Sequence, residues 1–215
     1  MKRIICLLCL QMSLLLAVNP ANLPLSRVKY NNNGSICRGY SKEPIEINGY
    51  SCVRYIWFYP EGTLDNFEVA DSTIINNIPI PARSKKFLTP DGVLDCVWFS
   101  RDVLVQGYFC PGGNCKEATG FHPNGQLRYV FPREPVEING ILCYPSGMTG
   151  VYFYPEGNLK SCYVYQDVDI QGKHYKKATQ LQFSQLGEII GSQRPSFFYR
   201  LFWWHIMYGL VKIIF

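Results

Sequence analysis

The sequence has little charge, only three histidines and no motif of a known catalytic site. Charged residues make up 17% of the chain, below the roughly 25% usual for soluble domains, whereas 15% of the residues are aromatic. This balance excludes an intrinsically disordered chain and a coiled coil, since both have fewer aromatic side chains and more charge. With 215 residues, the chain is long enough for one large domain or two small ones.

Motifs of enzyme active sites are absent from the sequence. It contains no G-x-S-x-G elbow, phosphate-binding glycine loop, H-E-x-x-H helix or calcium-binding loop. His122, His174 and His205 lie far apart, and none stands beside a nucleophile. We therefore assign no catalytic, cofactor-binding or metal-ligating residue and expect no cofactor. A non-enzymatic protein is the leading hypothesis, and a surface-associated hydrolase with a dispersed site is the alternative.

The formal net charge of +5 comes from the two ends of the chain. Residues 22–190 contain 16 Lys and Arg against 16 Asp and Glu, so this part is neutral and we expect no nucleic-acid partner. The basic cluster of Arg83, Lys85 and Lys86 is interpreted as a solvated strand face. The surplus cations are Lys2, Arg3, Arg194, Arg200 and Lys212.

Residues 1–21 have the pattern of a signal peptide or of an uncleaved signal anchor. Lys2 and Arg3 precede an apolar stretch, Ile4 to Val18, whose length fits a signal helix rather than a membrane-spanning one. We therefore expect an exported protein that is periplasmic, attached to the cell envelope or secreted. An asparagine-rich linker is expected over residues 22–42.

Residues 192–215 form an aromatic, hydrophobic tail. The stretch Phe197 to Phe215 approaches the ~20 residues that span a bilayer, but Arg200, His205 and Lys212 interrupt it. Two roles stay open with equal weight: contact with a membrane surface, as in a peripheral membrane component, and capping of the end of a sheet. A membrane contact would use Phe202, Trp203 and Trp204.

A short turn motif recurs through the middle of the chain. It combines an apolar residue, a proline, an acidic or amide residue, a glycine and an aliphatic residue, as in Phe58 to Leu64. Successive glycines are 30, 33, 32 and 30 positions apart, a regularity that indicates an internal repeat. The turn residues are Pro60, Gly62, Pro90, Gly92, Pro123, Gly125, Pro155 and Gly157, with Gly187 in a degenerate fifth copy.

The chemistry of this motif favours a β-hairpin. Proline presets φ at the second position of a type I turn, and glycine takes the left-handed position that closes the turn with a bulge. β-Branched and aromatic residues flank the copies, as in Tyr55 to Tyr59, and this composition is typical of strands.

A second repetition lies over the first. The segment Glu43 to Gly49 returns 91 positions later as Glu134 to Gly140, and each copy is followed by a cysteine and then by the turn motif. Glu43 and Glu46 have the residue types of a glycosidase couple, but because they recur with the repeat we interpret them as exposed strand residues. The predicted fold class is all-β, an elongated antiparallel sheet of repeated β-hairpins over residues 43–191.

This pattern, followed by I-N-G or I-Q-G segments such as Ile170 to Gly172, resembles the variant MORN-type repeats of bacterial proteins, many of them without an assigned function. The resemblance covers residues 43–190 and implies stacked β-hairpins in an elongated sheet. Together with the absent catalytic motifs, the repeat favours an exported scaffold or binding protein. It would act through the face of its sheet on an unknown protein or glycan partner.

Seven of the nine cysteines lie beyond the signal segment, and an exported chain is expected to oxidise some of them. Cys110 and Cys115 flank two glycines, and a two-residue turn there would bring their Cα atoms to ~4.5 Å, within disulfide reach. Cys52 and Cys143 occupy equivalent positions of the repeat, which suggests a shared structural role. Zinc is disfavoured because the histidines are remote and there is no second close-spaced cysteine pair.

Overall fold

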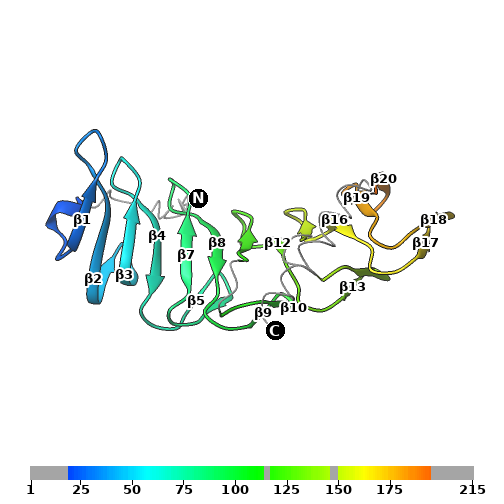
Figure 1. Cartoon of the computed structure of the whole chain (residues 1–215), viewed down its shortest axis with the longest axis horizontal. Helices are drawn as coiled ribbons and strands as arrows, with labels where there is room; N and C mark the ends of the chain where they lie inside the picture. Colours follow the sequence, from blue (N-terminus) through cyan, green and yellow to red (C-terminus); the bar gives the residue numbers. More distant parts are fainter. Residues whose placement is uncertain (1–18, 114–116, 146–149, 195–215) are drawn as a thin grey trace, which may run out of the picture.

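A computed structural model describes residues 19–113, 117–145 and 150–194 of the chain. These residues form a twelve-stranded antiparallel sheet and four two-stranded hairpins, and their one helical turn is the 3₁₀ helix η1 (Pro20–Asn22). Figure 1 shows the sheet as a long array, so the predicted all-β class with repeated hairpins is confirmed. The expected signal helix and hydrophobic tail fall largely on residues 1–18 and 195–215, outside the described residues.

The strands of the main sheet follow one another in chain order. They are β1 (Ser26–Tyr30), β2 (Ile36–Ile47), β3 (Tyr50–Phe58), β4 (Leu64–Val69), β7 (Lys85–Leu88), β8 (Leu94–Trp98), β11 (Thr119–Phe121), β12 (Leu127–Val130), β15 (Val151–Phe153), β16 (Leu159–Tyr163), β19 (Gln180–Phe183) and β20 (Ile189–Gln193).

Between strand pairs, the chain leaves the main sheet and forms short hairpins, which line one long side of the array in Figure 1. They are β5 (Thr73–Ile75) with β6 (Ile78–Ile80), β9 (Val103–Val105) with β10 (Tyr108–Cys110), β13 (Val136–Ile138) with β14 (Ile141–Cys143), and β17 (Val168–Ile170) with β18 (Lys173–Tyr175).

The proline-glycine motif closes the hairpins of the main sheet. In the first copy, the N–H of Gly62 donates to the carbonyl of Tyr59 at 2.9 Å, and the N–H of Tyr59 donates to the carbonyl of Thr63 at 2.9 Å. Gly62 has a φ of 91°, a backbone conformation that would be strained in a residue with a side chain. The register shifts beside this turn, so the hairpin ends in a β-bulge. The equivalent glycines, with φ from 75° to 89°, are Gly92, Gly125, Gly157 and Gly187.

Tight two-residue turns close the short hairpins. At Asn139 and Gly140, φ is 52° and 77°, the pair of positive angles that defines a type I′ turn and suits the twist of antiparallel strands. Asn48 and Gly49, with φ of 51° and 77°, form the same turn between β2 and β3. The repeated segment, Glu43 to Gly49 in the first copy and Glu134 to Gly140 in the second, therefore ends in the same turn both times.

The segment 22–42 differs from the expected linker, because most of it belongs to the sheet. Strands β1 and β2 pair across a turn in which the N–H of Asn31 donates to the carbonyl of Ser35 at 2.8 Å. The asparagines that suggested a linker build this turn, since Asn33 Oδ1 accepts from the N–H of Ser35 at 3.0 Å. The main sheet therefore begins at Ser26.

The hydrophobic core lies between the inner face of the main sheet and the short hairpins. Phe67 and Val97 of the sheet are 0% exposed, and Ile80 and Val105 of the hairpins are at most 2% exposed. Burying such a side chain contributes about 1.5–3 kcal/mol. The short hairpins, which would be marginal by themselves, are therefore held by their contact with the sheet.

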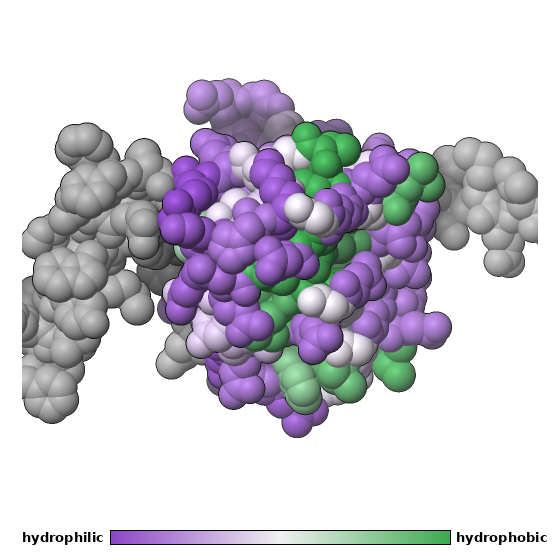
Figure 2. All heavy atoms as spheres, turned by 90° about the vertical axis from the view of Figure 1, so that its right-hand side faces the viewer, coloured by the Kyte–Doolittle hydropathy of each residue, from purple (hydrophilic) through white to green (hydrophobic). Residues whose placement is uncertain are grey.

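The C-terminal end of the array exposes apolar side chains beside the edge strand β20. Leu186 is 88% exposed and Ile190 is 65% exposed. Figure 2 views this end and shows an apolar strip framed by hydrophilic residues. The tail that is expected to cap the sheet or to contact a membrane follows in sequence at 195–215, outside the described residues, so both roles stay predictions.

Candidate functional site

A row of residues crosses the outer face of the main sheet, the face turned away from the short hairpins. Strand register places Arg38 beside Trp57 and Trp57 beside Asn66. Because neighbouring strands stay in step, the row runs along the whole array. It continues through Phe87, Cys96, Gly120, Tyr129, Tyr152, Ser161, Gln182 and Gly191.

Aromatic side chains gather around this row in three clusters. Their rings meet at an angle, as in Tyr40 with Tyr55 at 5.1 Å between ring centres and Phe87 with Trp98 at 4.9 Å. One ring of each cluster is more than a third exposed: Tyr55 at 39%, Trp98 at 37% and Tyr152 at 36%. The first cluster is Tyr40 and Tyr55 with Trp57, which shares the Arg38 guanidinium with Tyr55; the second is Phe87 and Trp98, and the third is Tyr129, Phe131 and Tyr152.

Arg38 supplies the cation of the first cluster. Its Cζ lies 4.8 Å from the ring centres of both Tyr55 and Trp57. Its Nε is buried without a hydrogen-bond partner, and within the described residues Arg38 makes no ion pair. A guanidinium held between two rings and not neutralised by an acid is suited to bind a carboxylate.

The other two clusters carry a cation of their own. Lys85 Nζ lies 5.1 Å from the ring centre of Phe87 and 5.4 Å from that of Trp98. Arg128 Cζ lies 5.2 Å from the ring centre of Tyr129, while its Nη2 donates to Asp95 at 2.7 Å. All three clusters therefore pair rings with a positive charge.

Gly120 allows the Tyr129 ring to lie across the sheet. These residues face each other on β11 and β12, and a Cβ added at Gly120 would overlap the Tyr129 ring at Cε1. Burial raises the pKa of Tyr129 to about 12, so its hydroxyl stays neutral at physiological pH. Because Gly120 has no Cβ, the Tyr129 ring can lie flat against the sheet in the third cluster.

The three clusters are evenly spaced. They centre on the pairs β2 and β3, β7 and β8, and β12 and β15, and each pair is three strands from the next. Adjacent strands lie about 4.8 Å apart, so the clusters repeat every ~14 Å along the array.

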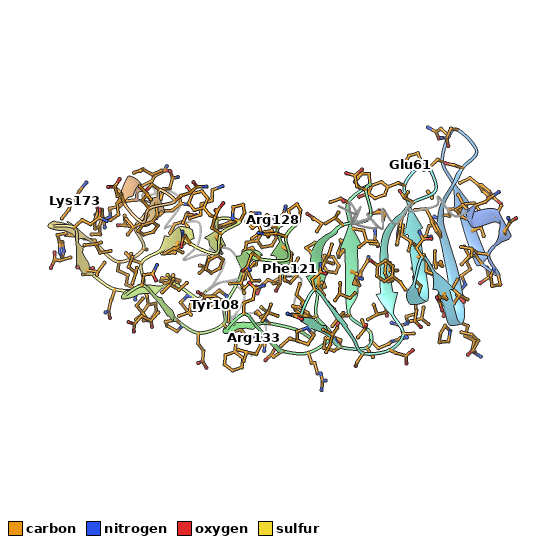
Figure 3. The ribbon with its side chains drawn as sticks, turned by 180° about the vertical axis from the view of Figure 1, so that it is seen from behind. Glu61, Tyr108, Phe121, Arg128, Arg133 and Lys173 are labelled. Carbon is orange, nitrogen blue, oxygen red and sulfur yellow. The ribbon has the colours of Figure 1, made fainter. Side chains whose placement is uncertain are left out.

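In Figure 3, Arg128 of the third cluster lies on the main-sheet side of Phe121, and Tyr108 and Arg133 lie on the hairpin side.

Sequence reasoning did not single out Arg38 or Arg128, and it placed Lys85 only in a basic cluster on a solvated strand face. Trp57 and Trp98 both lie on the outer face, where Trp98 pairs with Phe87 of the neighbouring strand. The alternation of side chains along each strand is the signal that could have found them. The bulge in each hairpin interrupts that alternation, so the facing set follows only from the strand register.

The predicted turn motif also joins neighbouring repeats. The residue before the proline reaches the next hairpin: Tyr59 Oη donates to the carbonyl of Leu88 at 2.8 Å, and Tyr154 Oη donates to that of Phe183 at 2.8 Å. His122 Nε2 lies 3.0 Å from the carbonyl of Phe153, in the equivalent place. This histidine therefore links two repeats.

Other residues considered from the sequence lie apart from the outer row. His174 is exposed and contacts Asp167 at 3.7 Å and Asp169 at 2.9 Å. Glu46 and Glu137 are exposed beside buried isoleucines, as predicted for strand residues. Among the described residues, no group of three or more acids, histidines and cysteines could hold a metal ion.

Lys86 differs from the solvated strand face expected for its cluster. It is 0% exposed in the core, where Phe67 of β4 and Val97 of β8 flank it. Burial lowers the pKa of Lys86 to about 7, with a smaller opposing effect of Cys52. Only one of the adjacent lysines can face outward from a strand, and Lys85 does so.

The predicted disulfide between Cys110 and Cys115 stays a prediction, since Cys115 lies outside the described residues. Cys110 is a buried free thiol whose Sγ lies 3.6 Å from the carbonyl of Tyr108, and burial raises its pKa to about 12. Cys52, Cys143 and Cys162 are also buried free thiols. The proposed membrane contacts Phe202, Trp203 and Trp204 lie outside the described part of the chain.

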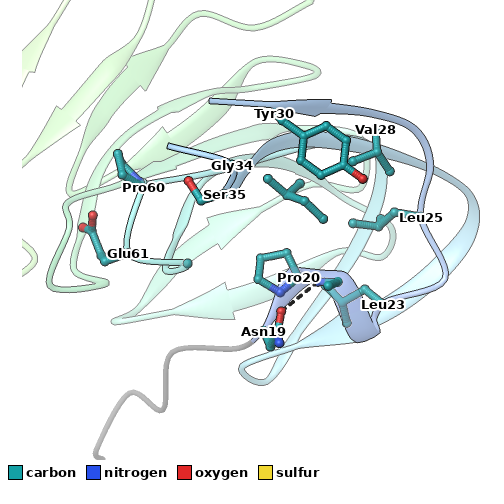
Figure 4. A pocket seen from close by; sticks show the side chains of 13 residues that line it. Asn19, Pro20, Leu23, Leu25, Val28, Tyr30, Gly34, Ser35, Pro60 and Glu61 are labelled. Atoms are coloured by element: carbon teal, nitrogen blue, oxygen red, sulfur yellow. Dashed lines mark hydrogen bonds between the residues drawn. The ribbon is translucent and has the colours of Figure 1, made fainter. Parts of the chain in front are cut away.

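Two hollows lie away from the outer row. One, of about 620 Å³, is lined by Leu25, Val28 and Tyr30 at the β1 end of the array, with Glu61 at its rim (Figure 4). The other, of about 450 Å³, lies beside the ion pair of Asp102 and Arg133. Neither brings together residues of a recognisable catalytic site.

No helix within the described residues is long and apolar enough to cross a membrane. No protein-family model matches the sequence, and no curated protein matches it.

Proposed function

We propose that the protein is an exported, non-enzymatic binding protein that holds an extended acidic glycan along the outer face of its sheet. The observation that carries the proposal is the even spacing of three clusters that each combine exposed rings with a cation. Ring faces stack on the apolar faces of sugars, and guanidinium or ammonium groups bind carboxylates. One chemical type of ligand can thus contact the rings of all three clusters and pair with the unneutralised Arg38.

The shape of the surface favours a linear ligand. The outer clusters are six strands apart, or about 29 Å, so a ligand that touches all three must extend over several sugar units. The hollows beside Leu25 and Asp102 lie elsewhere on the molecule and do not deepen this row. A polymer can gain from three weak contacts at once because each bound cluster raises the local concentration at the next.

The charge of the surface favours carboxylates over a nucleic acid. Residues 22–190 are neutral overall, and Asp95 already pairs with Arg128 at 2.7 Å. A polyphosphate needs an excess of cations along its path, whereas an occasional carboxylate needs a single one, such as Arg38.

Binding to polygalacturonate and to its neutral methyl ester tests the proposal. We expect the purified protein to bind the acid form more tightly and to leave its chain length unchanged. Trp98→Ala and Tyr152→Ala should each weaken binding about fivefold to tenfold in calorimetry. Phe109→Ala is the matched control, because Phe109 is 74% exposed on a short hairpin.

Three results would count against the proposal. One is absence of binding to either polymer, and another is equal loss of affinity in the Phe109 control. Shortening of the polymer by the protein would instead support the hydrolase alternative. Loss of binding in Trp98→Ala with an unchanged unfolding curve would support the assignment of the outer face.

A further inference from the structure

The duplicated chain builds the same core site twice. In the first half, Cys52 of β3 lies opposite Val69 of β4. In the second half, Cys143 of β14 lies opposite Val164, just beyond β16. Both cysteines are 0% exposed. Sequence and structure therefore agree that these two cysteines occupy one position of the repeat.

The two sites differ in the side chain beside the cysteine. Two residues before the facing valine, the first half has Phe67 and the second half has Cys162. Residues two apart along a strand point to the same side, so each lies diagonally across from its cysteine. Phe67 is 0% exposed and Cys162 is 1% exposed. The neighbour of Cys143 is therefore a second thiol, Cys162, whereas the neighbour of Cys52 is the ring of Phe67.

The backbone holds the second pair in place. The N–H of Tyr144 donates to the carbonyl of Tyr163 at 2.6 Å, and the N–H of Tyr165 donates to the carbonyl of Leu142 at 2.8 Å. These bonds flank Cys143 and the facing valine, which makes them a close, non-hydrogen-bonded pair. This register places Cys162 beside Cys143, and hydrogen bonding with the Cys162 thiol, together with burial, raises the pKa of Cys143.

We propose that Cys143 and Cys162 are a redox pair that closes into a disulfide and joins the short hairpin β13–β14 to the main sheet, while Cys52 stays a free thiol. Diagonal neighbours have Cα atoms about 7–8 Å apart, and disulfides usually need less than ~7 Å, so closure requires a small approach of β14 toward β16. Oxidised glutathione can act as the oxidant: the S–S bond between Cys143 and Cys162 forms while the S–S bond of oxidised glutathione breaks. Its two halves leave as two glutathione molecules that take up both thiol protons.

Burial determines when this exchange takes place. The attacking species is a thiolate, and both thiols are nearly inaccessible in the folded protein. Oxidation should therefore occur while the chain folds or while the hairpin β13–β14 opens. Once formed, the bond closes a loop of nineteen positions, which should raise the Tm by about 5–10 °C.

Peptide mapping after refolding tests the proposal. The full-length protein is refolded in oxidised or in reduced glutathione, alkylated and digested, and its disulfides are located by mass spectrometry. We expect a Cys143–Cys162 peptide only after oxidation and an alkylated Cys52 in both samples. Reduced thiols at both Cys143 and Cys162 after oxidative refolding, or a partner other than Cys162 for Cys143, would overturn the assignment. Disulfide formation by Cys52 would do the same.

Two variants separate the pair from general oxidation. Cys162→Phe copies the first-half site, so its Tm should no longer respond to the glutathione state. Cys52→Ser removes the cysteine at the equivalent position of the first half, and the Tm of this variant should respond to the glutathione state as the wild type does. An unchanged response in Cys162→Phe, or its loss in Cys52→Ser, would contradict the proposal. The wild-type peptide map decides the question even if a variant fails to fold.

Discussion

The Nζ atom of Lys86 lies 3.6 Å from the ring centre of Tyr50, inside the hydrophobic core. No hydrogen-bond partner for this amine is found among the described residues. In the second half of the chain, the equivalent position holds Leu181, which is also 0% exposed. One half of the duplication therefore keeps an amine where the other keeps an aliphatic side chain.

This lysine should make stability depend on pH. Its pKa falls from 10.5 to about 7 in the folded protein because of burial, so between these values the unfolded chain binds more protons. The free energy of unfolding contributed by Lys86 should therefore rise as the pH increases from 7 toward 10, and it should be flat well below pH 7. Urea unfolding of the wild type across this range, compared with Lys86→Leu, isolates the contribution from other titrating groups.

Lys86→Leu should stabilise the protein at pH 7. Replacing a buried amine with the aliphatic residue found at Leu181 removes the cost of desolvating the charge, on the order of 2–4 kcal/mol. Leu181→Met, which keeps the site apolar, serves as a control and should change stability by less than about 1.5 kcal/mol. A less stable Lys86→Leu at pH 7 would show that the contact with Tyr50 outweighs desolvation.

Removing a single hydroxyl should loosen the link between repeats. Tyr154→Phe leaves the ring in place but deletes the bond to the carbonyl of Phe183, so we expect a loss of about 1 kcal/mol in urea unfolding. Tyr59→Phe deletes the equivalent bond to Leu88 and should cost a similar amount. The two losses should add in the double variant, because the sites belong to separate repeats. No loss in either variant would mean that water replaces the bond.

A glutamine clamps a short hairpin to the next turn. Gln106 Nε2 donates to the carbonyl of Gly125 at 2.9 Å, and its Oε1 accepts from the N–H of Leu127 at 3.0 Å. Gln106→Asn keeps a residue that tolerates the type I′ turn but is too short to reach both groups. It should destabilise the protein by about 1–3 kcal/mol, as measured by thermal unfolding. Asn139→Asp, at the equivalent turn, should have a smaller effect.

Gly120→Ala should disturb the third aromatic cluster. The new methyl group would meet the Tyr129 ring and force it to move, at a cost of about 1–3 kcal/mol. Adding Tyr129→Ala removes the obstacle, so the double variant should lose less stability than the sum of the single changes. A strictly additive loss, measured by urea unfolding, would mean that the glycine serves the backbone rather than the ring.

The turns and the repeat could be predicted from the sequence because their causes are local. Gly62 and Gly157 sit in motifs whose backbone angles depend on a few neighbouring residues. The prediction of a linker over residues 22–42 was wrong, because asparagine favours a tight turn between strands as well as a flexible segment. Asn31 and Asn33 build such a turn.

The outer face could not be predicted because it depends on register between strands. Arg128 follows Leu127 at a bulge, where two residues oppose one, so simple alternation does not assign its direction. Lys86 was misplaced for a related reason: Phe87 and Leu88, which follow it, are both apolar, so the pattern does not show which face is inside.

The bonds from Tyr59 and Tyr154 to the next hairpin have an evolutionary consequence. In each half of the chain, a tyrosine before the motif proline donates to a backbone carbonyl of the next hairpin, so the junction does not depend on the side chain of the accepting residue. Recombination that copies or deletes the segment from Tyr59 to the residue before Tyr154 would therefore leave a tyrosine facing the same kind of carbonyl. The array can therefore change its length in single steps without a new fold having to arise.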